Sequence, residues 1–174
     1  LIQQRNLMQV PGDAEILNAI NQQIKSLNFF VLFLITHLDI EVIRKGILIS
    51  STWWDKKYYL KQGYLLVYET INTYNSHQSD LNRMSLSAPS ETKENFKKAS
   101  DKLKEFKKNF QYFKMKHIRN KVSAHIEKDM FAYYDALSSI DTENATDAIL
   151  TFAEILFDFV YLSKDFMLSN SAQL

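Results

Sequence analysis

The segment that decides the fold class runs from Leu17 to Leu38 and reads LNAINQQIKSLNFFVLFLITHL. Its apolar side chains recur at alternating steps of three and four, which places them on one stripe of a long helix: Leu17, Ile20, Ile24, Leu27, Val31, Leu34 and Leu38. Phe30 and Ile35 widen the stripe toward a face buried on two sides. The sequence therefore predicts a long helix with this stripe in the core.

The most apolar part of this helix, Leu27–Leu38, is interrupted by Asn28, Thr36 and His37. It is also well short of the roughly 20 apolar residues that span a bilayer. No charged and then apolar leader with a small-residue cleavage site stands out. We therefore expect neither a membrane partner nor secretion.

Composition points to a single helical domain over residues 1–174. The chain is 46% apolar, has only three glycines and two prolines, and contains no cysteine. So few turn-forming residues favour helices over a sheet. The lack of cysteine excludes disulfides and thiolate metal sites and fits a reducing, cytoplasmic setting.

A second helix is predicted over Trp53–Tyr74. Gly46 suggests a break before it, and Thr52 followed by Asp55 resembles a helix-capping box. Gly63 lies inside this helix, where it is expected to permit close helix packing.

A polar stretch over Asn75–Ser90 is predicted as a long loop between the second and third helices, with a short helix around Leu81–Leu86 left open within it. The third helix begins near Glu91 and carries a core stripe of Phe96, Ala99, Leu103, Phe106, Phe110 and Phe113, which continues as His117, Asn120 and Ala124. A short helix over Phe131–Leu137 and a last one from Asn144 to about Leu168 complete an all-α bundle of four to five main helices.

Charge is distributed unevenly along the chain although the net charge is only +1. Residues 1–91 carry eight basic and eight acidic side chains, residues 92–121 eleven and three, and residues 122–174 two and nine, so the segment charges are 0, +8 and −7. A basic helix is thus followed by an acidic C-terminal third.

The basic helix ends in the run Arg119-Asn120-Lys121-Val122-Ser123-Ala124-His125. A guanidinium and a titratable imidazole close together suit the binding or cleavage of a phosphodiester. On an unbroken helix Arg119 and His125 would lie about 120 degrees apart. Either the helix loosens before His125 or a second copy completes the site.

This run, on a third helix in an all-helical background, resembles the signature of the HEPN superfamily (higher eukaryotes and prokaryotes nucleotide-binding), most closely its abortive-infection branch. Many HEPN proteins are compact helical bundles that act as metal-independent ribonucleases in toxin and phage-defence systems. The resemblance implies a homodimer in which two motifs meet, RNA or nucleotide as ligand, no metal or other cofactor, and possible restraint by an antitoxin or regulatory protein.

By this resemblance the RNA 2′-hydroxyl attacks the adjacent phosphorus and leaves a 2′,3′-cyclic phosphate. His125 would move protons, Arg119 would hold the phosphate, and Asn120 would orient it. Lys114, Lys116 and Lys121 would attract the RNA backbone without reading its sequence.

Two other classes of function stay open: a non-catalytic HEPN domain that binds nucleotide or RNA or acts as an assembly module, and a helical interaction protein. In the structural interpretation His125 caps or packs, and Arg119 pairs with a carboxylate of the acidic C-terminal third. His117, on the core stripe, is expected to be buried and hydrogen-bonded, with entry into the cleft as the alternative.

Overall fold

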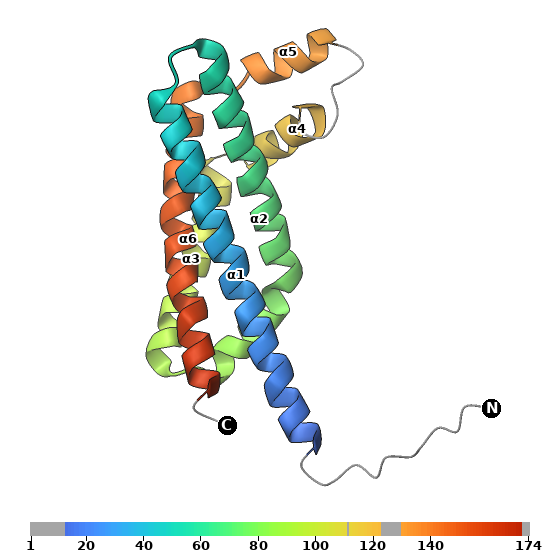
Figure 1. The fold of residues 1–174 in the computed structure, drawn as a ribbon, viewed down its shortest axis with the longest axis vertical. Helices are drawn as coiled ribbons and strands as arrows, with labels where there is room; N and C mark the ends of the chain where they lie inside the picture. Colours follow the sequence, from blue (N-terminus) through green and yellow to red (C-terminus); the bar gives the residue numbers. More distant parts are fainter. Residues whose placement is uncertain (1–12, 111, 123–129, 172–174) are drawn as a thin grey trace, which may run out of the picture.

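The computed structural model describes residues 13–110, 112–122 and 130–171, and within them all regular secondary structure is helical, without strands (Figure 1). The predicted all-α fold class is confirmed. The helices are α1 (Asp13–Ile49), α2 (Trp53–Ser87), α3 (Ser90–Asn109), α4 (Tyr112–Val122), α5 (Met130–Ser138) and α6 (Thr142–Ser171).

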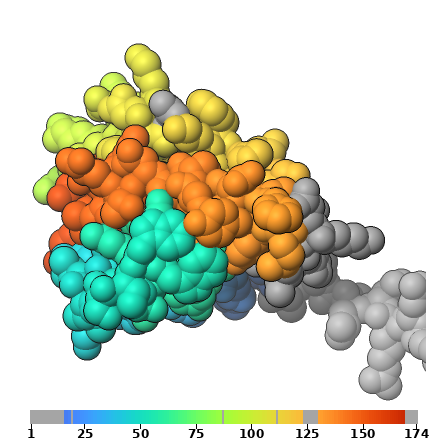
Figure 2. Space-filling model, turned by 90° about the horizontal axis from the view of Figure 1, so that it is seen from above, coloured from blue at the N-terminus to red at the C-terminus, as the bar shows by residue number. Residues whose placement is uncertain are grey.

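Helices α1, α2, α3 and α6 form the body of the molecule, in which α1 packs against both α2 and α6, and α3 packs against α6. The short helices α4 and α5 lie toward the end that holds the α1–α2 turn, where α4 packs on α2 and α5. Seen from that end, the start of α6 and α5 lie between the α1–α2 turn and α4 (Figure 2).

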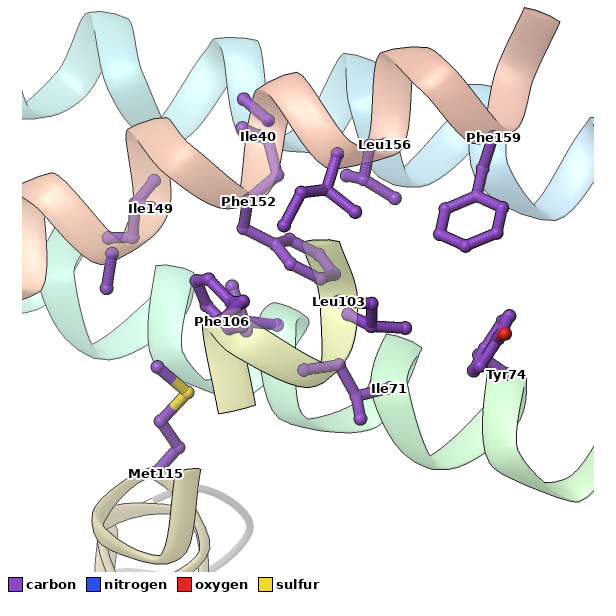
Figure 3. Packing of buried hydrophobic residues seen from close by; sticks show 14 of the residues in the cluster. Ile40, Ile71, Tyr74, Leu103, Phe106, Met115, Ile149, Phe152, Leu156 and Phe159 are labelled. Atoms are coloured by element: carbon purple, nitrogen blue, oxygen red, sulfur yellow. The ribbon is translucent and has the colours of Figure 1, made fainter. Parts of the chain in front are cut away.

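The core is built from large side chains of all four long helices (Figure 3). The largest fully buried ones include Phe33 of α1, Ile71 of α2, Phe106 of α3 and Phe152 of α6. The aromatic rings among them pack on one another; the centroids of the Phe106 and Phe152 rings, for example, lie 5.3 Å apart. Burying several aromatic side chains contributes strongly to folding, because each removes a large apolar area from water.

The predicted orientation of α1 is wrong. The side chains that face the core are Ser26, Phe29, Phe33, Thr36, Ile40, Ile43 and Ile47, whereas most of the stripe predicted to be buried, from Leu17 to Leu38, is exposed. α1 is apolar on two nearly opposite faces, and periodicity detects both without choosing between them. Phe33 settles the choice, because its ring stacks on Phe159 of α6 at 5.0 Å.

The predicted long polar loop over Asn75–Ser90 is also wrong, because α2 continues through it to Ser87. Leu81 and Met84 are buried one turn apart and hold this part of α2 on the body, while the polar residues 75–79 face solvent. The exposed face of this helix has the composition of a loop. The helix ends just before Pro89, which is preceded by an extended residue as proline requires.

Two glycines and one capping residue determine how α2 begins and how closely it packs against α1 and α6. Gly46 lies inside α1 rather than at a break, and a Cβ there would overlap the ring of Tyr59. At Gly63 a Cβ would overlap Ile149 of α6, which confirms the predicted close packing. Thr52 caps α2 as predicted, since its Oγ1 accepts a hydrogen bond from the Asp55 N–H at 3.0 Å.

The predicted third helix is two helices, α3 and α4, with a change of direction after Phe110. Phe96, Ala99, Leu103 and Phe106 are buried as predicted. Beyond the break the pattern shifts, so that Met115, Ile118 and Val122 are buried, whereas Phe113 and His117 are exposed. The expectation of a buried His117 is therefore wrong, because a new helix axis re-sets which residues face inward.

Candidate functional site

Helix α4 presents most of the residues that the sequence singles out. It carries four basic side chains, Lys114, Lys116, Arg119 and Lys121, and no acidic one. Met115, Ile118 and Val122 anchor it, since they recur at steps of three and four and are buried against the rest of the bundle. The other side of α4 is exposed to solvent, so the helix forms a small basic surface.

Arg119 and Asn120 lie in the last turn of α4, and both are exposed. The Arg119 Nε donates a hydrogen bond to Glu69 Oε1 of α2 at 2.8 Å, and 43% of the arginine side chain stays exposed. One carboxylate partner of this arginine therefore comes from α2. His125 lies outside the described residues.

The three predicted RNA-binding lysines lie on two sides of α4. Lys114 and Lys121 are seven residues apart and therefore share one side of the helix, whereas Lys116 lies one turn from Arg119. Lys114 and Lys116 are exposed, and Lys121 is half-buried. The basic surface consequently wraps around the helix instead of forming one flat face.

A cavity of about 330 Å³ opens beside α4 on the side of Lys114. Phe110, Phe113, Lys114, His117 and Ile118 line it from one side, and Tyr64, Ser139, Ile140, Asp141 and Asn144 line it from the other. Tyr64, His117 and Asp141 are far apart in the sequence and are brought together by the packing of the helices. No spacing in the sequence indicated this cavity; Asp141 was not among the predicted site residues, and His117 was placed in a cleft only as an alternative to burial.

The polar groups at the cavity are held in place by the start of α6. The Asp141 carboxylate accepts a hydrogen bond from the Asn144 N–H at 2.8 Å and so caps α6. Burial, and then the nearby Asp141 carboxylate, raise the pKa of Tyr64 to about 12, so its phenol stays protonated. Aromatic walls with a few fixed polar groups suit a planar ligand with a hydrogen-bonding edge.

Lys57 braces the same junction from α2. It is buried, and its Nζ donates a hydrogen bond to the Ile140 carbonyl oxygen. Burial lowers the pKa of Lys57, while the Asp141 carboxylate opposes that change. Lys57 therefore ties α2 to the turn before α6 and positions one wall of the cavity.

The basic and acidic parts of the chain meet within one subunit. α3 packs against α6, and the Lys102 Nζ lies 2.7 Å from Asp158 Oδ2. Two more α3 lysines pair within their own helix, Lys98 with Glu94 and Lys104 with Asp101. Three of the seven α3 lysines are thus paired, whereas α4 contains no acidic side chain of its own, which makes α4 the better surface for a polyanion.

Within residues 13–110, 112–122 and 130–171, no cluster of three or more histidine, aspartate or glutamate side chains is arranged to hold a metal ion. The fold and the site together define an all-helical bundle with an exposed basic helix, α4, beside a small aromatic-walled cavity. Comparison with known proteins adds no identity: no family model, no curated protein and no solved structure matches the chain.

Proposed function

We propose that this protein is a metal-independent endoribonuclease of the HEPN type, acting in the cytoplasm as a toxin or phage-defence effector under the control of a partner. The observation that carries the proposal is the exposure of Arg119 and Asn120 together in the last turn of a helix with four basic and no acidic side chains. An arginine needed only for folding would not have to lie on such a surface.

In the proposed reaction the RNA 2′-oxygen forms a bond to the adjacent phosphorus while the bond from phosphorus to the 5′-oxygen breaks. His125 accepts the 2′-hydroxyl proton, and the leaving 5′-oxygen takes up a proton from an acid or from water. Arg119 stabilises the negative charge that builds on the phosphate oxygens. The products are a 2′,3′-cyclic phosphate and a 5′-hydroxyl.

The role of Arg119 requires it to exchange partners. Glu69 accepts from its Nε in the free protein, and an exposed ion pair of this kind contributes only about 0–1 kcal/mol. A phosphodiester carries one negative charge and two non-bridging oxygens, as the Glu69 carboxylate does, and it can accept from the same guanidinium. The second negative charge that builds on phosphorus in the transition state then favours the phosphate over Glu69. Glu69 therefore positions the arginine without blocking it.

The test uses purified protein, a labelled RNA, and EDTA to remove metal ions. Cleavage that survives EDTA and leaves cyclic phosphate ends is expected for the wild type, with a loss of at least about a hundredfold for Arg119→Ala and for His125→Ala. Arg44→Ala is the matched control, because Arg44 is also an exposed, ion-paired helical arginine, far from α4 in the sequence. Intact RNA with the wild type, or equal cleavage by Arg119→Ala and the wild type, contradicts the proposal.

The cavity beside α4 favours a second function, non-catalytic binding of a nucleotide. Its aromatic walls suit a base, and Lys114 and His117 suit a phosphate at the rim. Calorimetric titration with adenosine and guanosine nucleotides tests this function. Saturable binding that weakens in Phe113→Ala, without any RNA cleavage, would support binding over catalysis.

A further inference from the structure

The outward face of α1 carries a second apolar stripe that the rest of the described chain leaves uncovered. Nine large apolar side chains on it are exposed: Ile16, Leu17, Ile20, Ile24, Leu27, Val31, Ile35, Leu38 and Val42. They lie on nearly the opposite side of the helix from the core residues Phe29, Phe33 and Ile40. Exposed apolar patches of this size mark interaction sites.

The stripe has the period of a helix-pairing seam. Two series of apolar residues each repeat every seven positions, the first being Leu17, Ile24, Val31 and Leu38 and the second Ile20, Leu27 and Leu34. A strict heptad of this kind keeps a seam facing one partner helix. The residues beside the seam are largely uncharged, including Asn21, Gln23 and Asn28, so two copies meet little like-charge repulsion.

The exposed area is sufficient for a dimer. The exposed fractions of the nine side chains correspond to roughly 800 Å² per protomer, which is about what each partner buries in an interface of ordinary size. The seam therefore needs no additional surface to hold two copies together.

A lipid surface fits this stripe less well than a second copy does. By length and composition Ile16–Ile49 passes the test for a membrane-crossing helix, with a mean hydropathy of 1.7 in its most apolar window, yet a third of that window is buried inside the bundle. A helix lying on a membrane usually has lysines and arginines along its polar face. Between Ile16 and Ile43 the only such residue is Lys25, which pairs with Asp80 at 2.8 Å.

The shape of the molecule indicates which way the two helices run. The N-terminal part of α1 projects beyond the body of the bundle (Figure 1). At the other end of the stripe, Val42 lines a groove between α1 and α2 whose walls are mostly apolar, with Tyr58, Leu65 and Leu66, and which also holds Asp39, Gln62 and Glu69. Antiparallel pairing would lay the projecting part of each α1 along the Val42 end and groove of its partner, whereas parallel pairing would leave both grooves empty.

We propose that two copies of this chain pair antiparallel along the outward stripe of α1. The two-fold axis crosses this stripe at the level of Phe29 along the helix. In that register Leu27 lies opposite Val31 of the second copy, and Ile20 opposite Leu38. Because α4 lies toward the α1–α2 turn, antiparallel pairing places the two α4 helices toward opposite ends of the dimer. The pairing is therefore independent of any contact between the two Arg119 motifs and of the proposed ribonuclease activity.

The first experiment measures molecular mass in solution across a range of protein concentrations. Leu27→Glu, which puts two carboxylates near the axis, is expected to halve the mass of the wild-type assembly and to raise its Kd at least about tenfold. Leu27 is already half-exposed, so the variant keeps its helical circular dichroism. Phe131→Glu, an exposed apolar residue of α5, is the matched control and leaves the mass unchanged.

The second experiment uses the absence of native cysteine. Ile20 and Leu38 lie about 27 Å apart along one helix, too far for a disulfide within a chain. The Ile20→Cys/Leu38→Cys double variant is expected to form disulfide-linked dimers on mild oxidation. Each single variant should stay as unlinked as Lys97→Cys, a solvent-facing control on α3.

Three results would overturn the pairing. One is a wild type that stays monomeric at every concentration. Another is a Leu27→Glu variant with the wild-type mass. The last is self-linking of each single cysteine variant, which indicates parallel helices. A monomer that floats with phosphatidylcholine vesicles, and loses this binding in Leu27→Glu, would assign the stripe to lipid instead.

Discussion

Gly63 offers a sharp test of how closely α2 and α6 approach each other. A Cβ at this position would overlap Cδ1 of Ile149 and lie 2.7 Å from its Cγ1, about 1 Å inside ordinary carbon contact. Overpacking of this kind costs about 1–3 kcal/mol. Replacing a helical glycine by alanine gains about 1 kcal/mol from backbone entropy and propensity. Gly63→Ala should therefore lower the free energy of unfolding by about 1 kcal/mol.

Gly63→Ala should raise the free energy of unfolding, rather than lower it, once the Ile149 side chain is shortened. Ile149→Ala deletes both clashing atoms, and alone it costs about 2–5 kcal/mol because it leaves a cavity. In that background Gly63→Ala should stabilise by about 1 kcal/mol, since only the helix gain remains and the methyl group fills part of the cavity. The double-mutant cycle therefore predicts a coupling of about 2 kcal/mol between positions 63 and 149.

Urea unfolding followed by helical circular dichroism measures all four proteins. Gly46→Ala serves as the control, because its Cβ would lie 2.6 Å from Cζ of the Tyr59 ring and does not involve Ile149. Gly46→Ala should destabilise equally in both backgrounds. If Gly63→Ala instead stabilises the wild type as much as the Ile149→Ala variant, the close approach of α2 and α6 is wrong.

Individual side chains give three further tests. Thr52→Ala should lower the free energy of unfolding by about 1 kcal/mol in urea because it removes the α2 cap, whereas the neighbouring exposed Ser51→Ala should change it little. Burial raises the pKa of both Tyr64 and Tyr112 to about 12 and also raises the pKa of Tyr74, so a near-ultraviolet absorbance titration should show three late tyrosines, one lost in each Phe variant. Because the folded pKa is the higher one, this contribution to stability is complete below pH 10 and is lost as pH rises toward 12; unfolding measured at pH 9 and 11 checks the sign. His37 Nδ1 is buried and has no hydrogen-bond partner within the part of the chain that the structure describes. His37→Leu should therefore raise the free energy of unfolding by about 1 kcal/mol, which a higher melting temperature would show.

Local pattern was sufficient for some of the fold. The scarcity of glycine and proline predicted helices, the α3 stripe from Phe96 to Phe106 predicted its buried side, and Thr52 predicted the start of α2. Each of these features depends on neighbours within about one helical turn, and such interactions can be read directly from the residue order.

The candidate site was predictable only in part. The basic character of α4 follows from the residues present in that segment, whereas the exposure of Asn120, which the sequence placed on the core stripe, does not. The Glu69 partner of Arg119 lies 50 residues away, and the cavity joins Tyr64, His117 and Asp141 from three separate segments. Contacts at that separation leave no periodic signal, because they depend on how whole helices pack.

The sequence by itself determined that the chain is helical and where its basic surface lies, since propensity, capping and charge are local properties. Tertiary structure decided which apolar face of α1 is buried, because Leu27 and Phe29 are both strongly hydrophobic and only packing against α2 and α6 selects Phe29. It also decided that α2 runs on to Ser87 and that the chain turns after Phe110, since burial of Leu81 and Met115 outweighs the polar residues around them.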